Sequence, residues 1–210
     1  IKLIQTLIST DCKKFVFSSS GGTIFGEPNV IPTSEEDFAG EPVSPYGVAK
    51  KKLNDFIKLM LENEKMSYSI LNLSNVYGPR QDPHGEAGVM SIFTGKMLNN
   101  ENPIIYGDGN QTRDYIYVAD VVSALIKSSE NDSDLFLNIG TGVETSVNEL
   151  VSLIASKTSW HGEPDYKPQR DGELLRSVLN NNKAKQSLDW LPIYDINKGI
   201  EELVNWFKSE

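Results

Sequence analysis

Two apolar strands separated by a long helical segment are the feature that most limits how this chain can fold. Phe15-Val16-Phe17 runs into a serine cluster and a glycine pair, and a second apolar run covers 68–73. Between them, over 46–64, apolar residues recur at helical spacing, at Ala49, Leu53, Phe56, Ile57 and Met60. Parallel strands need a long crossover connection, which a helix usually supplies. The order strand, helix, strand therefore predicts a parallel sheet covered by helices.

The rest of the chain predicts a more mixed arrangement. Helices are expected near 87–98, 118–128 and 198–208, and strands near 104–106 and 135–139.

Three further patterns complete the expected order of elements. Ser146-Val-Asn-Glu149 has the form of a capping box and predicts a helix that runs to Ser156. The charged, irregular stretch over 160–173 is expected to be a loop that closes over a site. Apolar residues at 1, 3, 4, 7 and 8 place the start of the chain inside a helix, without a starting methionine, so we expect a piece of a longer protein.

Composition excludes several classes of protein. The net charge of -9 disfavours nucleic acid, whose phosphates attract basic surfaces. No apolar run approaches the roughly 20 residues of a membrane span, so no membrane association is expected. Cys12 is the only cysteine and cannot form an internal disulfide, which favours a reducing, cytoplasmic compartment. His84 and His161 are isolated, so no metal site is expected.

Tyr46 and Lys50 are the strongest candidates for chemistry. Four residues apart on the expected helix, they share one face, so the ammonium group can sit beside the phenol and favour the phenolate. Such a tyrosine takes a proton from a sugar or alcohol hydroxyl near neutral pH. Pairs of this kind also occur by chance, with a merely solvated lysine. The functional interpretation is favoured because ligands bind beyond the carboxyl ends of parallel strands, where Ser20 and Asn75 are expected.

Several motifs follow one another along most of the chain. They are Ser18-Ser-Ser20, Pro45-Tyr-Gly-Val-Ala-Lys50, Asn75-Val-Tyr-Gly-Pro-Arg80, Gly85-Glu-Ala-Gly-Val89, Gly107-Asp-Gly-Asn-Gln-Thr-Arg-Asp-Tyr115, Asn138-Ile-Gly-Thr-Gly142 and Arg170-Asp-Gly-Glu173. In this order they resemble the extended short-chain dehydrogenase/reductase family, specifically UDP-glucose 4-epimerases and their close relatives. The resemblance runs from about Phe15 to the C-terminus.

The resemblance implies an α/β fold with a partial Rossmann-type, doubly wound parallel sheet and a smaller mixed α/β domain that binds nucleotide-sugar. It assigns 1–80, with returning segments near 114–142, to the NAD-binding domain, and 81–210 mainly to the substrate-binding domain.

The resemblance also implies a reaction. A UDP-hexose, UDP-glucose or UDP-galactose, is epimerised at C4 through a transient 4-keto sugar, with NAD as the cofactor. Tyr46 takes the proton of the 4-hydroxyl, and Lys50 lowers the pKa of the tyrosine and hydrogen-bonds the nicotinamide ribose. Ser20 hydrogen-bonds the reacting oxygen, with Ser19 as the second choice, and Ser18 is expected to be only a strand-end cap.

The other site residues follow from the same motifs. The cofactor side is expected to comprise Phe17, Ser18, Ser19, Tyr46, Lys50, Leu73, Asn75 and Val76. The substrate side is expected to comprise Ser20, Asn75, Val89, Ile105, Tyr106, Arg113, Arg170 and Glu173. In this set Arg113 and Arg170 bind the diphosphate, since a planar guanidinium suits phosphate. Glu173 hydrogen-bonds the ribose, and Val89, Ile105 and Tyr106 contact the uracil. From the residues alone, Asn75 is equally well explained as a turn residue. Apolar residues such as Val89, Ile105 and Tyr106 would by default belong to the hydrophobic core.

The sequence departs from the family pattern at several positions. Phe25 stands where many relatives carry tyrosine, and Asn72 where many carry arginine, so one local hydrogen-bond network is expected to differ. Gly21 and Gly22 occupy the place of the acid pair of related dehydratases, which disfavours an elimination. The glycine-rich turn of a dinucleotide site is missing from the sequence, so we expect the chain as given not to hold NAD tightly and to be inactive alone.

Other functions stay open at this stage. One is another nucleotide-sugar epimerase, dehydratase or reductase of the same family, and another is a catalytically inactive chain that binds nucleotide-sugar or a partner subunit. Family members commonly form homodimers through the helix that carries the tyrosine. The apolar stripe from Leu53 to Met60 suits such an interface, and it equally suits packing against the sheet.

Overall fold

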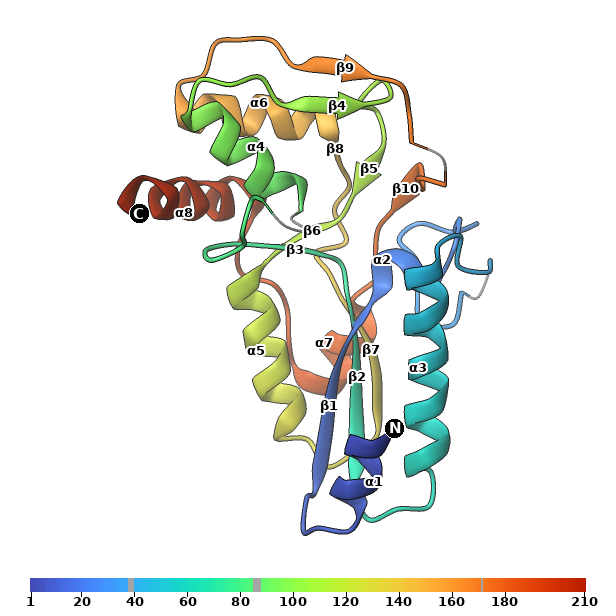
Figure 1. The fold of residues 1–210 in the computed structure, drawn as a ribbon. Helices are drawn as coiled ribbons and strands as arrows, with labels where there is room; N and C mark the ends of the chain where they lie inside the picture. The colour runs from blue at the N-terminus through green and yellow to red at the C-terminus, as the bar shows by residue number, and fades with distance from the viewer. Residues whose placement is uncertain (38–39, 85–87, 171) are drawn as a thin grey trace.

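The computed structural model describes residues 1–37, 40–84, 88–170 and 172–210. The chain forms a lower layered part built on a parallel sheet and an upper part in which helices pack beside short strands (Figure 1). The sheet consists of β1 (Lys14–Ser20), β2 (Ser67–Leu73) and β7 (Leu135–Ile139) in the order β1-β2-β7. All its pairings are parallel, which confirms the expected parallel α/β sheet.

Helices cover both faces of this sheet. On one face, Ile57 and Leu61 pack with Ile70 and with Ile4; the helices there are α1 (Lys2–Ile8) and α3 (Pro45–Leu61). On the other face, leucines of β2 and β7 pack with Trp190 and with α5 (Val118–Ser129) and α7 (Asn182–Leu188). Because both faces are buried, the strands carry nearly continuous apolar runs, as parallel sheets generally do.

The apolar residues of α3 do not all face the sheet. Ile57 is buried against the sheet, whereas the side chains of Leu53 and Phe56 are 41% and 46% exposed. The polar Asn54 occupies the buried face with Ile57 and Leu61. The expectation that 53–60 forms one stripe is therefore wrong, because the helix carries apolar residues on two of its faces.

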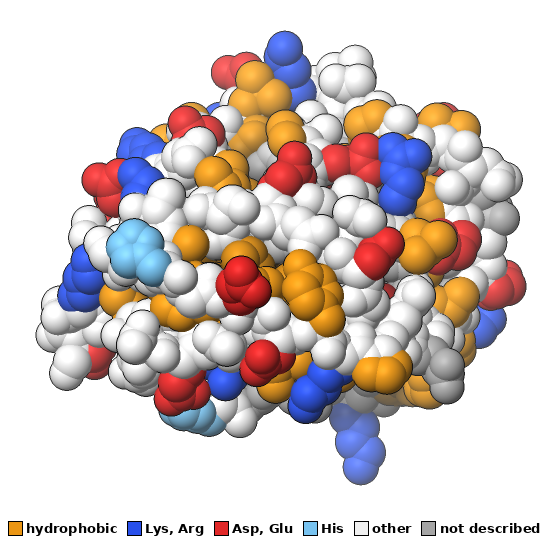
Figure 2. Space-filling view, turned by 90° about the horizontal axis from the view of Figure 1, so that it is seen from above, with side chains coloured by type: hydrophobic (Ala, Val, Ile, Leu, Met, Phe, Trp, Pro, Cys, Tyr) orange, Lys and Arg blue, Asp and Glu red, His pale blue; other side chains and the backbone are white. Residues whose placement is uncertain are grey.

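The upper part is a second core. It is formed by α4 (Val89–Leu98), α6 (Val147–Thr158) and α8 (Ile196–Ser209), covered by the parallel pair β4 (Ile104–Tyr106) and β9 (Asp165–Lys167). The capping box that opens α6 is confirmed, because the Ser146 hydroxyl accepts from the backbone of Glu149 and the Glu149 carboxylate accepts from the backbone of Ser146. Seen from above, acidic and basic side chains are interspersed over this part (Figure 2).

Short strands join the two parts. They are β3 (Asn75–Tyr77), which pairs with β6 (Tyr115–Tyr117), and β5 (Thr112–Arg113), which pairs with β8 (Thr145–Ser146) and β10 (Arg176–Ser177). A four-residue helix, α2 (Gly21–Ile24), follows β1 directly.

Three local expectations change. Asn75 opens a strand rather than a turn, and its backbone N–H donates to the carbonyl of Asp114. The stretch over 160–173 contains β9 instead of being wholly irregular, because its backbone pairs with β4. The helix expected from residue 87 begins at Val89, and 85–87 lie outside the described residues.

Candidate active site

A cavity of about 400 Å³ lies in the upper part and reaches Asn75, two residues beyond the carboxyl end of β2. All the expected substrate-side residues except Ser20 line it, namely Asn75, Val89, Ile105, Tyr106, Arg113, Arg170 and Glu173. They come from five different elements and loops, so the fold brings together residues almost a hundred positions apart. In the motif Arg170-Asp-Gly-Glu173, position 171 is outside the described residues.

The cavity has one polar end. Arg113 Nη2 lies 3.5 Å from Glu173 Oε1, and Arg113 Nη1 donates to the carbonyl of Thr112 at 2.8 Å. The other carboxylate oxygen of Glu173 is buried without a hydrogen-bond partner among the described residues. The arginine is thus held in place while an acceptor next to it is left free for a donor such as a ribose hydroxyl.

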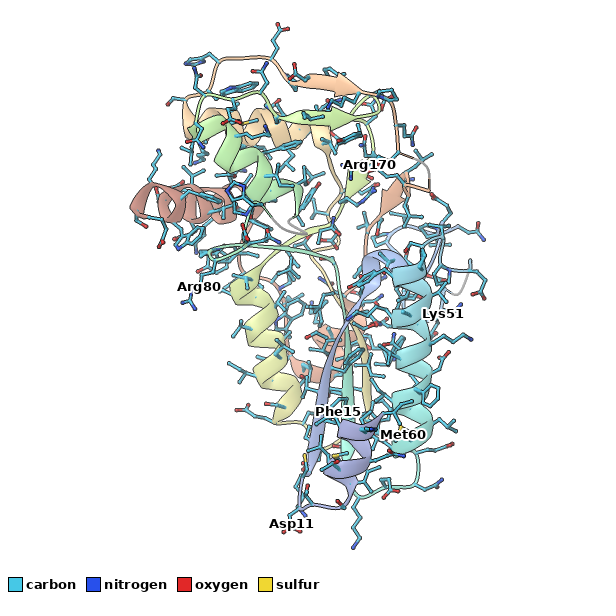
Figure 3. The ribbon with its side chains drawn as sticks, viewed as in Figure 1. Asp11, Phe15, Lys51, Met60, Arg80 and Arg170 are labelled. Atoms are coloured by element: carbon cyan, nitrogen blue, oxygen red, sulfur yellow. The ribbon has the colours of Figure 1, made fainter. Side chains whose placement is uncertain are left out.

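The other end is walled by apolar and aromatic side chains. The guanidinium carbon of Arg170 lies 3.8 Å from the ring centroid of Tyr106, and the hydrogen bond and charge of this arginine lower the pKa of the Tyr106 hydroxyl. Figure 3 places Arg170 in the upper part, above the end of α3 that carries Tyr46. The aromatic and apolar wall suits a flat base, and an arginine at each end of the cavity suits an anionic ligand between them.

Sequence reasoning missed Tyr115 and Gln111. The Tyr115 hydroxyl is buried and has no partner among the described residues, and burial raises the pKa of this phenol. Gln111 lines the same cavity and its amide donates to the carbonyl of Tyr106 at 2.8 Å. A signal for Tyr115 was present, because residues two apart in extended backbone point to the same side and Arg113 was already assigned.

Asp114 lies between Arg113 and Tyr115 in the sequence, and its side chain holds together the backbone segments next to the cavity. Its side chain accepts from the backbone of Thr141, Gly142 and Leu179 and from the Thr141 hydroxyl, at 2.6–3.3 Å. Burial raises the pKa of this carboxyl, and the four hydrogen bonds oppose that change. Asp114 thus joins β6 to the loop after β7 and to the segment after β10.

A second cavity, of about 210 Å³, extends the first toward α3. It shares Asn75, Arg113 and Glu173 with the first cavity and adds Gly22, Thr23, Val43, Ser44, Gly172 and Leu174. We call the two together the cleft. The cleft therefore runs from the aromatic pocket at Tyr106 to the first residues of α3.

Thr23 and Ser44 bring hydroxyls to this end of the cleft, whereas the expected Ser20 does not line it. Ser20 is not among the lining residues, and its Oγ accepts from Thr23 Oγ1 at 3.0 Å. Ser19 points under α3 and its hydroxyl is buried without a partner among the described residues. Thr23 was missed because a four-residue helix that opens with two glycines gives no periodic signal.

Tyr46 and Lys50 lie beside this end of the cleft. Ser44 caps α3 by accepting from the backbone of Gly47 at 3.1 Å, and Tyr46 follows it with its side chain 55% exposed. Lys50 Nζ is 5.7 Å from the ring centroid of Tyr46 and 4.9 Å from that of Phe17, and it donates to the carbonyl of Ser18 at 3.0 Å. The phenol and the ammonium therefore share one side of the helix, as the spacing predicts.

Six of the expected cofactor-side residues lie on β1, at the end of β2 and at the start of β3, and the other two, Tyr46 and Lys50, lie on α3. The exposed Tyr46 hydroxyl and the Lys50 ammonium, with the Ser18 carbonyl beside them, form a polar group that fits a nicotinamide ribose. A pyrophosphate is held by a glycine-rich turn at a helix N-terminus. Within the described ranges the only helix that opens with paired glycines is α2, which has four residues. The residues present thus fit the nicotinamide end of NAD.

In the part of the chain that the structure describes, no helix is both long and apolar enough to cross a bilayer. Over the same residues, no group of three or more His, Cys, Asp or Glu side chains is placed to hold a metal ion.

Comparisons with known proteins agree with this geometry. Residues 1–203 match the family model described as GDP-mannose 4,6 dehydratase. A putative UDP-glucose 4-epimerase from Methanocaldococcus jannaschii is 47% identical over 209 residues, which are 100% of this chain and 68% of that protein. Other matched relatives include a nucleotide-sugar reductase and a dehydratase.

Solved structures show the same fold. The UDP-glucose 4-epimerase of Thermotoga maritima with UDP-glucose has a TM-score of 0.95 and 43% identity, covering 99% of this chain and 67% of that one. The UDP-glucose 4-epimerase of Thermus thermophilus, in complex with NAD, has a TM-score of 0.88 and 32% identity, covering 98% and 67%. The partial Rossmann-type fold is thereby confirmed, and this chain spans about two thirds of the length of these proteins.

Proposed function

This chain belongs to the nucleotide-sugar epimerase and dehydratase family, whose members are enzymes that use NAD, and we propose that it carries the catalytic and substrate-binding residues of a UDP-hexose 4-epimerase. The single observation that carries the proposal is the cleft. One continuous hollow joins an aromatic pocket, a held arginine and Ser44, the N-cap of α3, two residues before the exposed Tyr46.

Each part of the cleft suits one part of a UDP-sugar. Tyr106 and its apolar neighbours would hold the uracil, and Glu173 would accept from the ribose through its unpartnered oxygen. Arg113 and Arg170 would bind the diphosphate, and the Tyr115 hydroxyl offers one more donor there. The hexose then lies in the second cavity, beside Thr23 and next to the start of α3.

Chain residues would handle the proton of the reaction. Tyr46 removes the proton of the sugar 4-hydroxyl and later returns it, acting as base and then as acid. Thr23, with Ser20 behind it, hydrogen-bonds the same oxygen and keeps it oriented. Lys50 and Tyr46 would hold the nicotinamide ribose. When bound, NAD supplies the acceptor and donor of hydride.

The test of this function is product analysis on the whole gene product that contains this chain, with NAD added, because the chain as given is not expected to hold NAD tightly. UDP-glucose, UDP-galactose, UDP-N-acetylglucosamine and UDP-glucuronic acid are incubated separately, and the products are separated by capillary electrophoresis. Interconversion of UDP-glucose and UDP-galactose is the expected result. If only another UDP-sugar is converted, that sugar is the substrate instead of UDP-glucose. Tight UDP binding without turnover would favour a chain that only binds nucleotide-sugar.

Replacing Thr23 by valine tests the hydroxyl that lines the cleft. Valine keeps the β-branched shape and removes only the donor, so we expect kcat to fall about tenfold with little change in the Kd for UDP. Ser20→Ala should cost less, because Ser20 is separated from the cleft by Thr23. Steady-state kinetics and calorimetry with UDP measure both effects. A larger loss in Ser20→Ala than in Thr23→Val would return the role to Ser20.

We also propose that two copies associate through the outer face of α3. Val48, Phe56 and Leu59 lie on this face and are 44%, 46% and 70% exposed. Leu59→Glu is expected to yield a monomer in sedimentation equilibrium, because a buried unpaired charge would oppose the interface. Ile126→Glu on α5 is the matched control, since that isoleucine is 54% exposed on another helix. An unchanged mass for Leu59→Glu would contradict the proposed interface.

A further inference from the structure

A row of polar side chains crosses the sheet beneath α3. Ser19 of β1, Asn72 of β2 and Asn138 of β7 are neighbours in register. The row below it is apolar, with Phe17, Ile70 and Phe136 in the same order. A buried sheet face normally stays apolar, because an amide taken out of water must find partners. The presence of three polar residues on this buried face therefore needs a specific explanation.

Hydrogen bonds link the row to the helix above it and to a distant loop. Asn54 of α3 donates to Asn72, and Asn72 donates to Asn138, both at 3.3 Å. Asn138 donates through its side chain to the carbonyl of Thr33 at 3.0 Å and through its backbone to Glu35 Oε1 at 2.6 Å. We call Asn54, Asn72 and Asn138 the asparagine row. All these residues are at most 5% exposed.

Glu35 is the unusual member of this network. A glutamate that is 5% exposed is normally paired with a cation, yet none of the ion pairs among the described residues includes it. The charged groups that act on it are Lys183 of α7 and its neighbour Glu36. Burial is the largest influence and raises the pKa of the Glu35 carboxyl. The network thus ends in a carboxyl that is costly to ionise.

The loop that this carboxyl holds supports both walls of the cleft. Thr33 donates through its backbone to Val178 and accepts from the backbone of Asn180, both at 2.8 Å. That segment follows Glu173 and Leu174, which line the cleft. In the other direction, the loop leads to Val43 and Ser44, which line the opposite wall and open α3.

We propose that Glu35 and the asparagine row are positioning residues, which fix the start of α3 against the cleft and hold it most firmly when Glu35 is protonated. The kinetic part of this proposal rests on the proposed function, whereas the structural part does not. The network touches neither the cleft nor Tyr46 directly, so it acts only through the placement of α3 and of the segments 33–37 and 40–44.

The direction of the pH effect follows from the raised pKa. Between the ordinary pKa of a glutamate and the raised one, the unfolded chain loses the Glu35 proton before the folded chain does. The contribution of Glu35 to the free energy of unfolding is therefore fully present below this window and is lost as the pH rises through it. Glutamine at position 35 accepts the same hydrogen bond without ionising, so the loss should disappear.

Hydrogen exchange and thermal unfolding between about pH 4.5 and pH 8.5 test this part. For the unmodified chain, protection of 33–37 and 43–46 is expected to fall as the pH rises, after correction for intrinsic exchange. Glu35→Gln should remove that decline and raise Tm at the alkaline end. Glu64→Gln is the matched control, because Glu64 is exposed and is not among the charged groups that act on Glu35. Parallel curves for Glu35→Gln and the unmodified chain, or a decline spread over the whole molecule, would overturn the proposal.

The helix end of the network is tested with Asn54→Leu. Leucine has the same branching and the same number of side-chain heavy atoms, and it removes both the donor to Asn72 and the unpartnered Asn54 Oδ1. A positioning role predicts about a tenfold lower kcat with unchanged UDP affinity, and a loss of Tm no larger than that of Ile57→Ala. Ile57→Ala is the control that lowers Tm without touching the network. An unchanged kcat in Asn54→Leu overturns the positioning role. If even the unmodified whole gene product shows no turnover with NAD added, the proposed function fails, and the exchange data still decide on Glu35.

Discussion

Replacing Tyr46 by phenylalanine is expected to lower kcat for the interconversion of UDP-glucose and UDP-galactose by about a thousandfold, the middle of the range for lost acid–base catalysis. The change removes one oxygen at the end of the cleft and leaves the aromatic ring. The side chain is 55% exposed, so its loss of a hydroxyl should not change Tm. Affinity for UDP should also stay the same, because Tyr46 is outside the residues that line the cavity.

Tyr166→Phe is the matched control for this experiment. Tyr166 is 58% exposed on β9, and its hydroxyl contacts only Asn148 within the described residues, at 3.3 Å. Rates are measured with saturating UDP-sugar and added NAD, and UDP binding is measured by calorimetry. If Tyr46→Phe kept a tenth of the activity, another group would be the base. If both variants lost UDP binding, the change would report on folding instead.

The sheet was predictable because its signals are local. Phe15-Val16-Phe17 and 68–73 are short apolar runs bounded by polar residues, and the capping box at Ser146 marks a helix start by itself. The direction in which α3 faces was not predictable. Leu53, Phe56 and Ile57 all fit a helical stripe, and only the packing of Ile57 against Ile70 shows which arc meets the sheet.

The candidate site was likewise predictable only in part. Arg113, Arg170 and Glu173 were expected from family motifs, and the fold brings them to one cavity although no spacing in the chain links them. Thr23 and the asparagine row were not expected as site features. Their meaning depends on contacts across the sheet, such as Asn72 to Asn138, which join residues 66 positions apart. The sequence pattern marked Asn72 only as a departure, and the structure supplies the partners that explain it.

Arg113→Gln is expected to weaken UDP binding about a hundredfold, because a charge-assisted contact to phosphate is lost and Glu173 keeps a buried charge without its partner. The Arg113 side chain is only 16% exposed, so little water shields this contact. Calorimetry with UDP measures the loss, and repeating it with uridine separates the phosphates from the base. Uridine should bind the variant and the unmodified chain nearly equally.

Arg80→Gln controls for the change in net charge. Arg80 does not line the cavity, and Figure 3 shows it beside the upper end of α5, away from Arg170. It should change UDP affinity less than twofold in physiological salt, because exposed charges farther apart than about 8 Å are largely screened. An equal loss in both variants would mean that UDP responds to overall charge and not to a built site. A loss confined to Arg113→Gln that is as large for uridine as for UDP would place the base, not the diphosphate, against this arginine.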